Sequence, residues 1–247
     1  MKFINITNDN IDEHDFCCIG DRVDYLIGYD AKRKWLKERL KEGHVFYKLD
    51  VAGRVFIEYA PLEKSWVPII GKNYMYIYCL WVGSNFQGKG YGKKLLERAI
   101  RESKEKGMNG ICTMAVKKKV SFFSVDEIYK KYGFQVIDQI GPYELLALSF
   151  HPSDLPKFHE SARKMSIDDK KPTIYYLPQC PFVIQGVRMI EDYAKKHHKD
   201  VVIKEVTSLK EAKQMPCVFQ NWANFINGKH SHHYLLNPKM LDSIFDE

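Results

Sequence analysis

The stretch best suited to binding a ligand is a glycine-rich run that follows an apolar segment and precedes an amphipathic one. It reads Gln87, Gly88, Lys89, Gly90, Tyr91, Gly92, Lys93. Glycines at alternate positions leave the peptide backbone open to close approach. The N-terminus of the helix that follows adds unpaired N–H groups and the positive end of a helix dipole. The lysines of the run bring further positive charge. Such a turn predicts a binding site for an anion such as a pyrophosphate.

The spacing of these glycines distinguishes between the known phosphate loops. A Rossmann fingerprint needs G-x-G-x-x-G and a P-loop needs G-x-x-x-x-G-K-[ST], and neither fits. With Gln87, Gly90 and Gly92 at its fixed positions, the run resembles the [Gln/Arg]-x-x-Gly-x-[Gly/Ala] signature of the GNAT acyltransferases. The resemblance covers residues 1–150 and implies that the turn binds the pyrophosphate of acetyl-coenzyme A. The alternative is a glycine-rich turn that only begins a surface helix.

The same resemblance implies roles for residues outside the turn. A Tyr-x-x-x-Gly-Phe pattern begins at Tyr129, and in the family this tyrosine often protonates the departing thiolate of coenzyme A. The alternative for Tyr129 is a buried ring that fills space between helix and sheet. Backbone N–H groups of the strand before the turn, at Leu80, Trp81 and Val82, would stabilise the thioester carbonyl. Glu58, on an adjacent strand, would draw the amine proton through water, and its alternative is an exposed strand carboxylate.

The spacing of the cysteines in the chain matches no known metal-binding or redox pattern. None of the six cysteines forms a C-x-x-C pair, and no Cys/His spacing resembles a zinc site. Cys79 lies beside the proposed thioester position, where covalent catalysis is an alternative to direct transfer. A strand cysteine is more typically a small core residue, and this is how we interpret Cys79.

Residues 172–247 resemble a small thioredoxin-like domain. Cys180 follows a strand and opens a helix, where the helix dipole would favour its thiolate, and Pro216 before Cys217 stands in the place of that fold's cis-proline. Val183 replaces the second cysteine of C-x-x-C. An acetyltransferase with such a tail resembles the YoaP-like acetyltransferases. Three interpretations stay open: a domain for substrate recognition or packing, a monothiol redox or sensing element, and a soft-metal site made by the two thiols.

The alternation of apolar and amphipathic segments predicts an α/β (α+β) protein of two domains. The resemblance implies a GNAT acyl-CoA N-acyltransferase fold at 1–150, a mixed central sheet flanked by helices, and a thioredoxin-like α/β domain at 172–247. The linker is expected at 151–171, which is rich in Pro and Asp. Strands are expected at 2–7, 44–49, 54–59, 74–82, 111–116, 134–139, 144–150, 173–177, 201–206, 217–225 and 231–235. Helices are expected at 31–42, 124–132, 182–196, 209–213 and 238–245, and from the glycine turn to about residue 106.

Composition narrows the choice of partners. The net charge is +7, and its basic excess lies in residues 51–150, as a polyanionic ligand would favour. The run Lys117–Lys119 lacks interleaved aromatics and is interpreted as a solvated loop, with contact to a cofactor phosphate as the alternative, so no nucleic acid is expected. No apolar stretch reaches 18 residues and the N-terminus is unlike a signal peptide, which indicates a cytoplasmic protein with no membrane partner. No metal is expected, and a homodimer is one arrangement that the sequence allows.

Taken together, the resemblance implies an N-acyltransferase that moves an acetyl group from acetyl-coenzyme A to an amine by direct transfer in a ternary complex. The acceptor would be a small molecule or a peptide, and no residue pattern identifies it. The alternative is a thiol sensor or adaptor that binds coenzyme A without acyl turnover and uses Cys180 and Cys217. Release of free thiol from acetyl-coenzyme A in the presence of amines separates the two.

Overall fold

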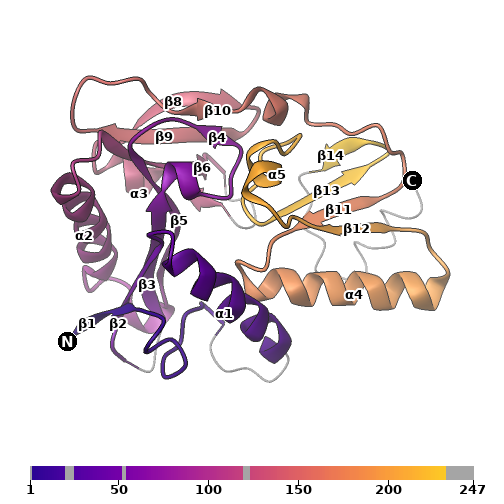
Figure 1. Cartoon of the computed structure of the whole chain (residues 1–247), viewed down its shortest axis with the longest axis horizontal. Helices are drawn as coiled ribbons and strands as arrows, with labels where there is room; N and C mark the ends of the chain where they lie inside the picture. Colours follow the sequence, from indigo (N-terminus) through magenta and orange to yellow (C-terminus); the bar gives the residue numbers. More distant parts are fainter. Residues whose placement is uncertain (1, 20–24, 52–53, 119–122, 232–247) are drawn as a thin grey trace. The chain divides into compact units, whose positions relative to one another are not determined.

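A computed structural model describes residues 2–19, 25–51, 54–118 and 123–231 (Figure 1). It divides the chain into two compact units. Unit 1 consists of Met1–Asp21, Arg33–Ser65 and Ile69–Phe158. Unit 2 consists of Arg22–Lys32, Trp66–Pro68 and His159–Glu247. Two short segments from the N-terminal part of the chain therefore belong to the second unit, an assignment that no local sequence pattern indicated.

Unit 1 is built on an eight-stranded mixed sheet. Its strands are β1 (Phe3–Ile6), β2 (Val45–Leu49), β3 (Val55–Pro61), β5 (Tyr74–Val82), β6 (Gly110–Val116), β7 (Ser124–Val125), β8 (Gln135–Ile140) and β9 (Tyr143–Ser149). They lie in the order β1-β2-β3-β5-β6-β9-β8, and β7 pairs with β6. The pairs β5–β6 and β6–β7 are parallel, and the other neighbours are antiparallel. A separate two-stranded sheet joins β4 (Ile69–Ile70) to β10 (Lys157–Phe158).

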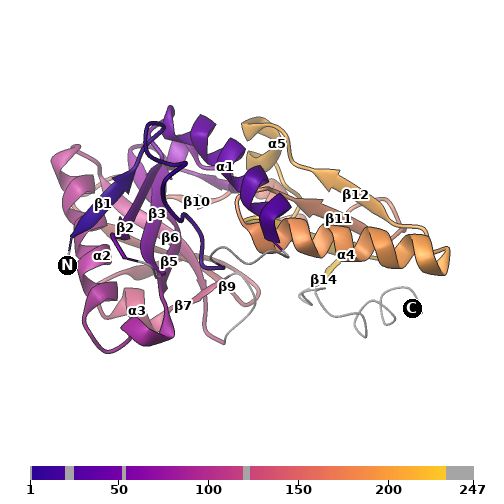
Figure 2. The same ribbon diagram turned by 90° about the horizontal axis from the view of Figure 1, so that it is seen from below.

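Helices cover both faces of this sheet. They are α1 (Leu26–Leu40), of which Arg33–Leu40 belongs to unit 1, α2 (Tyr91–Glu105) and α3 (Glu127–Lys130), with short 3-10 turns η2 (Leu62–Lys64) and η3 (Ser84–Phe86). Figure 2 shows α2 and α3 on one side of the central strands and α1 on the other. Helix α2 buries Tyr91, Leu95 and Ala99, which recur every four residues and so form one apolar face. That face packs against Ile57 and Ile77 of β3 and β5 in the main core.

Polar contacts fix α2 against the sheet. The phenol of Tyr59 on β3 donates a hydrogen bond to Glu102 Oε2 (2.7 Å). Arg98 and Lys106 pair with the same carboxylate at 2.8 and 2.7 Å. Burial alone would raise the pKa of Glu102, but the bonds from Lys106 and Tyr59 and the charges of Lys106 and Arg98 hold it below its ordinary value. The Tyr59 bond thus joins the C-terminal half of α2 to β3, and the two ion pairs hold the Glu102 carboxylate in place within the helix.

Unit 2 contains a four-stranded sheet with one long helix. Its elements are η4 (Glu160–Lys164), β11 (Thr173–Tyr176), α4 (Pro181–His197), β12 (Val202–Glu205), α5 (Leu209–Lys213), β13 (Trp222–Ile226) and β14 (Lys229–Ser231). The strand order is β12-β11-β13-β14, parallel between β11 and β12 and antiparallel elsewhere. Helix α4 and the short α5 lie on opposite sides of this sheet (Figure 1). The turn between β13 and β14 holds Asn227 and Gly228 at φ 51° and 76°, as an Asn-Gly hairpin requires.

Several expected elements differ from the structure. Ser124–Tyr132 was expected to be one helix, yet Ser124–Val125 is a strand paired with β6 and only Glu127–Lys130 is helical. Strand pairing with a distant segment overrides the local helical pattern there. The strand expected at 217–225 begins only at Trp222. Its first residues include Cys217 and Phe219, which are fully buried in the core as a loop, and a buried apolar run does not by itself distinguish loop from strand.

The expected linker also carries regular structure. Residues 151–171 include β10, which pairs with β4, and the 3-10 helix η4. The helix expected at 238–245 and residues 232–235 of the last expected strand lie outside the described residues. Within the described ranges, no helix has the length and apolarity that crossing a membrane requires.

Candidate active site

The central feature of unit 1 is a place where the sheet opens beside β5. Strand β3 pairs with β5 from Val55–Val82 to Pro61–Met75, with a register shift that leaves Tyr78 as an extra residue. This is a β-bulge, which bends a strand and changes where its side chains point. Among the described residues, β6 pairs with β5 only over Tyr74–Tyr76, and further along it pairs with β7 instead. The outer half of β5 therefore keeps β3 on one side and parts from β6 on the other.

The backbone of this outer half presents its polar groups alternately. Gly83 N–H donates to the Arg54 carbonyl across the ladder (2.7 Å). Because hydrogen-bonding groups alternate along an antiparallel strand, Trp81 also directs its backbone towards β3, and Leu80 and Val82 direct theirs to the open side. The side chain of Gln87 agrees with this, since its amide donates to the Val82 carbonyl (3.4 Å). Of the three predicted backbone donors, Leu80 and Val82 thus face the gap, and Trp81 does not.

The glycine turn lies between the end of β5 and the start of α2. Gly88 and Gly90 have φ of 71° and 75°, a left-handed conformation that side chains disfavour. A Cβ atom at either position would meet nothing within 4 Å, so the protein itself leaves the space above them open. No described side chain caps the first turn of α2. The first helical N–H groups and the exposed residues 87–90 therefore leave backbone donors open, as the predicted anion site requires.

Three elements converge at the first turn of α2. A Cβ atom on Gly92 would lie 3.7 Å from Val82 Cγ2 and 3.8 Å from Ile128 Cδ1. The end of β5 and the helix α3 thus both lie next to the turn. The lysines around the glycine turn are exposed. Lys89 donates a hydrogen bond to the Asn85 carbonyl (2.9 Å), and Lys93 forms an ion pair with Glu97 (3.7 Å). Both contacts are at the surface and are weak enough to be exchanged for a ligand phosphate.

Tyr129 on α3 lies beside the open part of the sheet. Its side chain is 1% exposed, and its ring packs on Phe134 at 5.4 Å between centroids. Burial raises the pKa of Tyr129 to about 12, with a smaller contribution from nearby Cys79, and hydrogen bonds with the side chains of Ser124 and Thr113 oppose the shift. The phenol is thus close to β5 through Cys79 and to β6 through Thr113. It retains its proton at neutral pH.

Ion pairs between exposed lysines and buried carboxylates hold the short helix α3 in place. Lys130 contacts Asp126 and lies 3.1 Å from Glu144 Oε2, and Lys117 lies 3.3 Å from Glu144 Oε1. Glu144 on β9 is 1% exposed. Burial would raise the pKa of Asp126, but the hydrogen bond from Lys130 and its charge hold that pKa below its ordinary value. A helix of one turn has little stability of its own, so these contacts position Tyr129. Lys117 lies in an exposed bend after β6, as the interpretation of a solvated loop expects, and it pairs with Glu144 from there.

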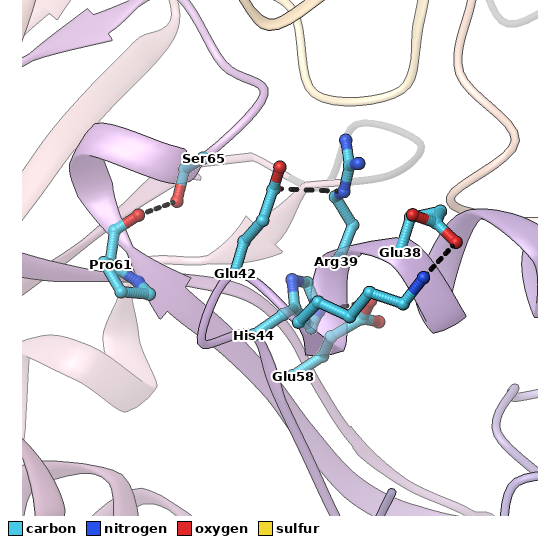
Figure 3. A network of polar contacts seen from close by, with 8 residues as sticks. Glu38, Arg39, Glu42, His44, Glu58, Pro61 and Ser65 are labelled. Carbon is cyan, nitrogen blue, oxygen red and sulfur yellow. Dashed lines mark hydrogen bonds and ion pairs between the residues drawn. The ribbon is translucent and has the colours of Figure 1, made fainter. Parts of the chain in front are cut away.

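Glu58 lies on β3, the strand that pairs with β5 on the side away from β6, and it is buried. Its exposed fraction is 0%, so the interpretation of an exposed strand carboxylate is wrong. Its partner in the ladder is Cys79, next to the bulge. Its Oε1 lies 3.0 Å from Nε2 of His44, whose side chain is 2% exposed (Figure 3). The sequence analysis did not single out His44. Its signal in the sequence was its position just before β2, which is the strand beside the strand of Glu58.

The two cysteines of unit 2 differ in environment. Cys180 is half-buried and is the N-cap residue of α4, with Pro181 as the first helical residue, as the sequence indicated. Cys217 is fully buried, and desolvation raises its pKa far above the ordinary value, so it stays a protonated thiol. The described residues contain no cis peptide bond, so the bond before Pro216 is trans and departs from the cis-proline that the resemblance implied. Within the described part of the chain, no three His, Cys, Asp or Glu side chains cluster as a metal site.

A sheet that opens beside a bulged strand, with a glycine turn at the head of the next helix, is the arrangement of an acyltransferase. The model of the acetyltransferase (GNAT) family matches residues 9–134, just over half of the chain, and a YoaP-like model matches residues 202–242. The chain belongs to the GNAT acetyltransferase family. It is 34% identical over 248 residues to an uncharacterized N-acetyltransferase, YoaP, of Bacillus subtilis (strain 168), covering 100% of this chain and 99% of that protein. The resemblances to the GNAT acyltransferases and to the YoaP-like acetyltransferases are confirmed.

Solved structures of acetyltransferases are also similar to part of the chain. An aminoglycoside 6'-acetyltransferase type Ii matches with a TM-score of 0.45 and 17% identity over 62% of this chain and 100% of that chain. The PaiA N-acetyltransferase from Thermoplasma acidophilum, in complex with coenzyme A, matches with a TM-score of 0.43 and 16% identity over 61% of this chain and 100% of that chain. The family assignment rests on the sequence matches and not on these scores.

Proposed function

We propose that this acetyltransferase moves the acetyl group of acetyl-coenzyme A to an amine of a small molecule or a peptide, by direct transfer in a ternary complex. One observation carries the proposal. The uncapped glycine turn, the outward-facing backbone of Leu80 and Val82, and the phenol of Tyr129 all border the place where β5 parts from β6. Each supplies one need of acyl transfer from a thioester.

In this proposal the turn binds the pyrophosphate of coenzyme A. Backbone N–H groups of residues 88–92 and the positive end of the α2 dipole favour a negative charge there. The side chain of Gln87 ties the turn to the end of β5 (3.4 Å) and so fixes its position. Lys89 and Lys93 add charge at the rim, and Tyr91, which is largely buried, anchors the helix start. The nucleotide end of the donor is thus held beside α2, and its thioester reaches along β5.

Chemistry then proceeds in one displacement sequence. The amine nitrogen attacks the acetyl carbonyl carbon, and the N–H groups of Leu80 and Val82 stabilise the negative charge that develops on its oxygen. The amine proton passes to the Glu58 carboxylate, directly or through a water molecule. The carbon–sulfur bond breaks, and the departing thiolate takes the phenolic proton of Tyr129. Solvent then returns a proton to Tyr129 and takes up the proton held by Glu58. The products are the acetylated amine and coenzyme A with a free thiol, so atoms and charge balance.

The structure weakens the thiol-sensor alternative in one respect. A sensor that uses Cys180 and Cys217 together needs both thiols to reach a reagent, and Cys217 is fully buried with a raised pKa. Cys180 alone, half-buried at the N-terminus of α4, keeps a sensing role open to test. The role of unit 2 as a thioredoxin-like domain stays a prediction from the sequence.

The test is turnover. Purified protein is mixed with acetyl-coenzyme A and a panel of amines that includes polyamines, aminoglycosides and peptides with free N-termini, and thiol release is followed with a chromogenic disulfide. We expect saturable release with at least one amine, together with its acetylated product by mass spectrometry. Tight binding of coenzyme A with no release across the panel would favour the sensor.

A further inference from the structure

We propose that His44 and Glu58 form one proton-accepting pair, in which His44 positions the Glu58 carboxylate and shares the proton that it takes from the amine. The inference rests on the proposed function and adds to it a residue that does not touch the substrate. His44 acts through Glu58 and is therefore a positioning residue. Its Nε2 lies 3.0 Å from Glu58 Oε1, within hydrogen-bond distance.

The burial of the pair explains why Glu58 needs such a partner. Glu58 is 0% exposed and the His44 side chain is 2% exposed. A carboxylate removed from water is costly unless it is hydrogen-bonded or paired. A lysine or arginine partner would stay charged in every step. An imidazole can donate a hydrogen bond to the carboxylate before proton transfer and carry a positive charge after it, so the pair can take up a proton without leaving an isolated charge.

The position of the imidazole is fixed by its surroundings. The backbone N–H of His44 donates a hydrogen bond to the Arg39 carbonyl at the end of α1 (3.1 Å), and Gly43 turns the chain there with φ 91°. The rings of Trp35 and Tyr78 lie 5.4 and 5.1 Å from the imidazole centroid. These rings pack around the imidazole, one edge-on and one tilted, and keep water away from it. Tyr78 is the extra residue of the bulge, so the same irregularity that opens the sheet also supplies one of these rings.

Within the described part of the chain, the titratable groups near the pair include Cys79, the ladder partner of Glu58, and the phenols of Tyr78 and Tyr76. Tyr78 faces the pair from β5, and Tyr76 lies behind Tyr78 at 5.0 Å. Burial raises the pKa of Tyr76 well above its ordinary value, so that phenol stays protonated. At the end of α1, Arg39 pairs with Glu42 (3.1 Å), and these opposite charges offset one another (Figure 3). The acid side of a pH profile should therefore report the His44–Glu58 pair and not a neighbour.

The matched variant for the test is His44→Gln. The glutamine amide can still donate a hydrogen bond to Glu58, but it cannot take up a proton. Wild type, His44→Gln, Glu58→Gln and the double variant are compared with the amine that the wild type acetylates, as kcat/KM against pH, with coenzyme A affinity by calorimetry as the control for folding. We expect unchanged affinity, a fall of about 10- to 100-fold in kcat/KM for His44→Gln, and a larger fall for Glu58→Gln, as for removal of a general base. The double variant should be no worse than Glu58→Gln, since the two residues act as a unit.

The shape of the profile separates this role from a structural one. A shared proton predicts that His44→Gln changes the acid limb of the profile, whereas a merely structural loss would lower the rate equally at every pH. A second readout needs no acceptor: the ring nitrogen signals of His44, assigned by their absence in His44→Gln, should titrate differently in Glu58→Gln and in wild type. Identical titration of His44 in Glu58→Gln and wild type, or a His44→Gln profile that superimposes on the wild type, would overturn this inference and leave the proposed function standing. No thiol release by the wild type with any amine would overturn the proposed function and this inference with it.

Discussion

Replacement of Gly90 by leucine tests the binding of the donor most directly, because the chain contains a matched control at the other end of the same helix. Gly90 precedes α2 with φ 75°, and Gly107 follows it with φ 67°. A Cβ atom at either glycine meets nothing within 4 Å. The two substitutions therefore impose the same kind of backbone strain without a clash, and only one of them is in the proposed site.

The expected magnitudes follow from this geometry. A leucine in the left-handed region costs about 1–2 kcal/mol, so both variants should lose about that much free energy of unfolding. At Gly90 the new side chain also covers the N–H groups at the start of α2. A hydrogen bond to a charged group contributes about 1.5–3 kcal/mol. At 1.4 kcal/mol for each factor of ten, the dissociation constant for coenzyme A should rise about 10- to 100-fold.

The assay combines urea unfolding of each variant with titration calorimetry of coenzyme A at low ionic strength. Gly107→Leu should show the loss of stability with wild-type affinity, and Gly90→Leu should show both effects. Wild-type affinity in both variants would refute the assignment of the pyrophosphate to this turn. An equal loss of affinity in both would show instead that the affinity follows the stability of α2.

The remaining predictions concern Tyr129 and the thiols. Tyr129→Phe keeps the ring that packs on Phe134 and should lower kcat by about 10²–10⁴ while leaving coenzyme A affinity unchanged; a wild-type kcat would reassign the general acid. Because burial raises the pKa of Tyr129 to about 12, the unfolded chain loses this phenolic proton first as the pH rises from 10 to 12. The free energy of unfolding should fall over that range, with a share on the order of 3 kcal/mol that is missing in Tyr129→Phe; parallel pH curves from urea titrations would contradict it. Cys217 should resist a thiol reagent in the native protein and react on unfolding. Cys180→Ser should keep full transfer activity, and a loss of activity would show that this thiol takes part in transfer or its regulation.

Local patterns predicted much of the fold and one part of the site. The bounds of β5 (Tyr74–Val82) and α5 (Leu209–Lys213) agree with the sequence prediction to the residue. The start of α5 is signalled locally, since Ser208 accepts from the Glu211 N–H (3.1 Å) and Glu211 accepts from the Thr207 N–H (3.0 Å). The glycine turn is likewise local, because positive φ at Gly88 and Gly90 and the helix that follows depend on neighbouring residues alone.

Contacts between distant segments could not be predicted in this way. The helix expected over Ser124–Tyr132 is cut short because Ser124–Val125 pairs with β6. The burial of Glu58 depends on the register between β2, β3 and β5, and the pairing with His44 joins β3 to the residue that precedes β2. Strand register is a choice among partners far apart in the chain, and a shift of one residue reverses the face on which each side chain lies.

The amino-acid sequence by itself determined that this chain carries a glycine-rich turn before a helix, a tyrosine pattern and the family that both indicate. These depend on backbone conformation and on residue types a few positions apart. The tertiary structure alone decided that β5 bulges at Tyr78 and parts from β6, that Tyr129 meets Cys79 there, and that His44 lies against a buried Glu58. The physical reason is that the partner of a strand and the burial of a carboxylate are set by which distant segments pack together.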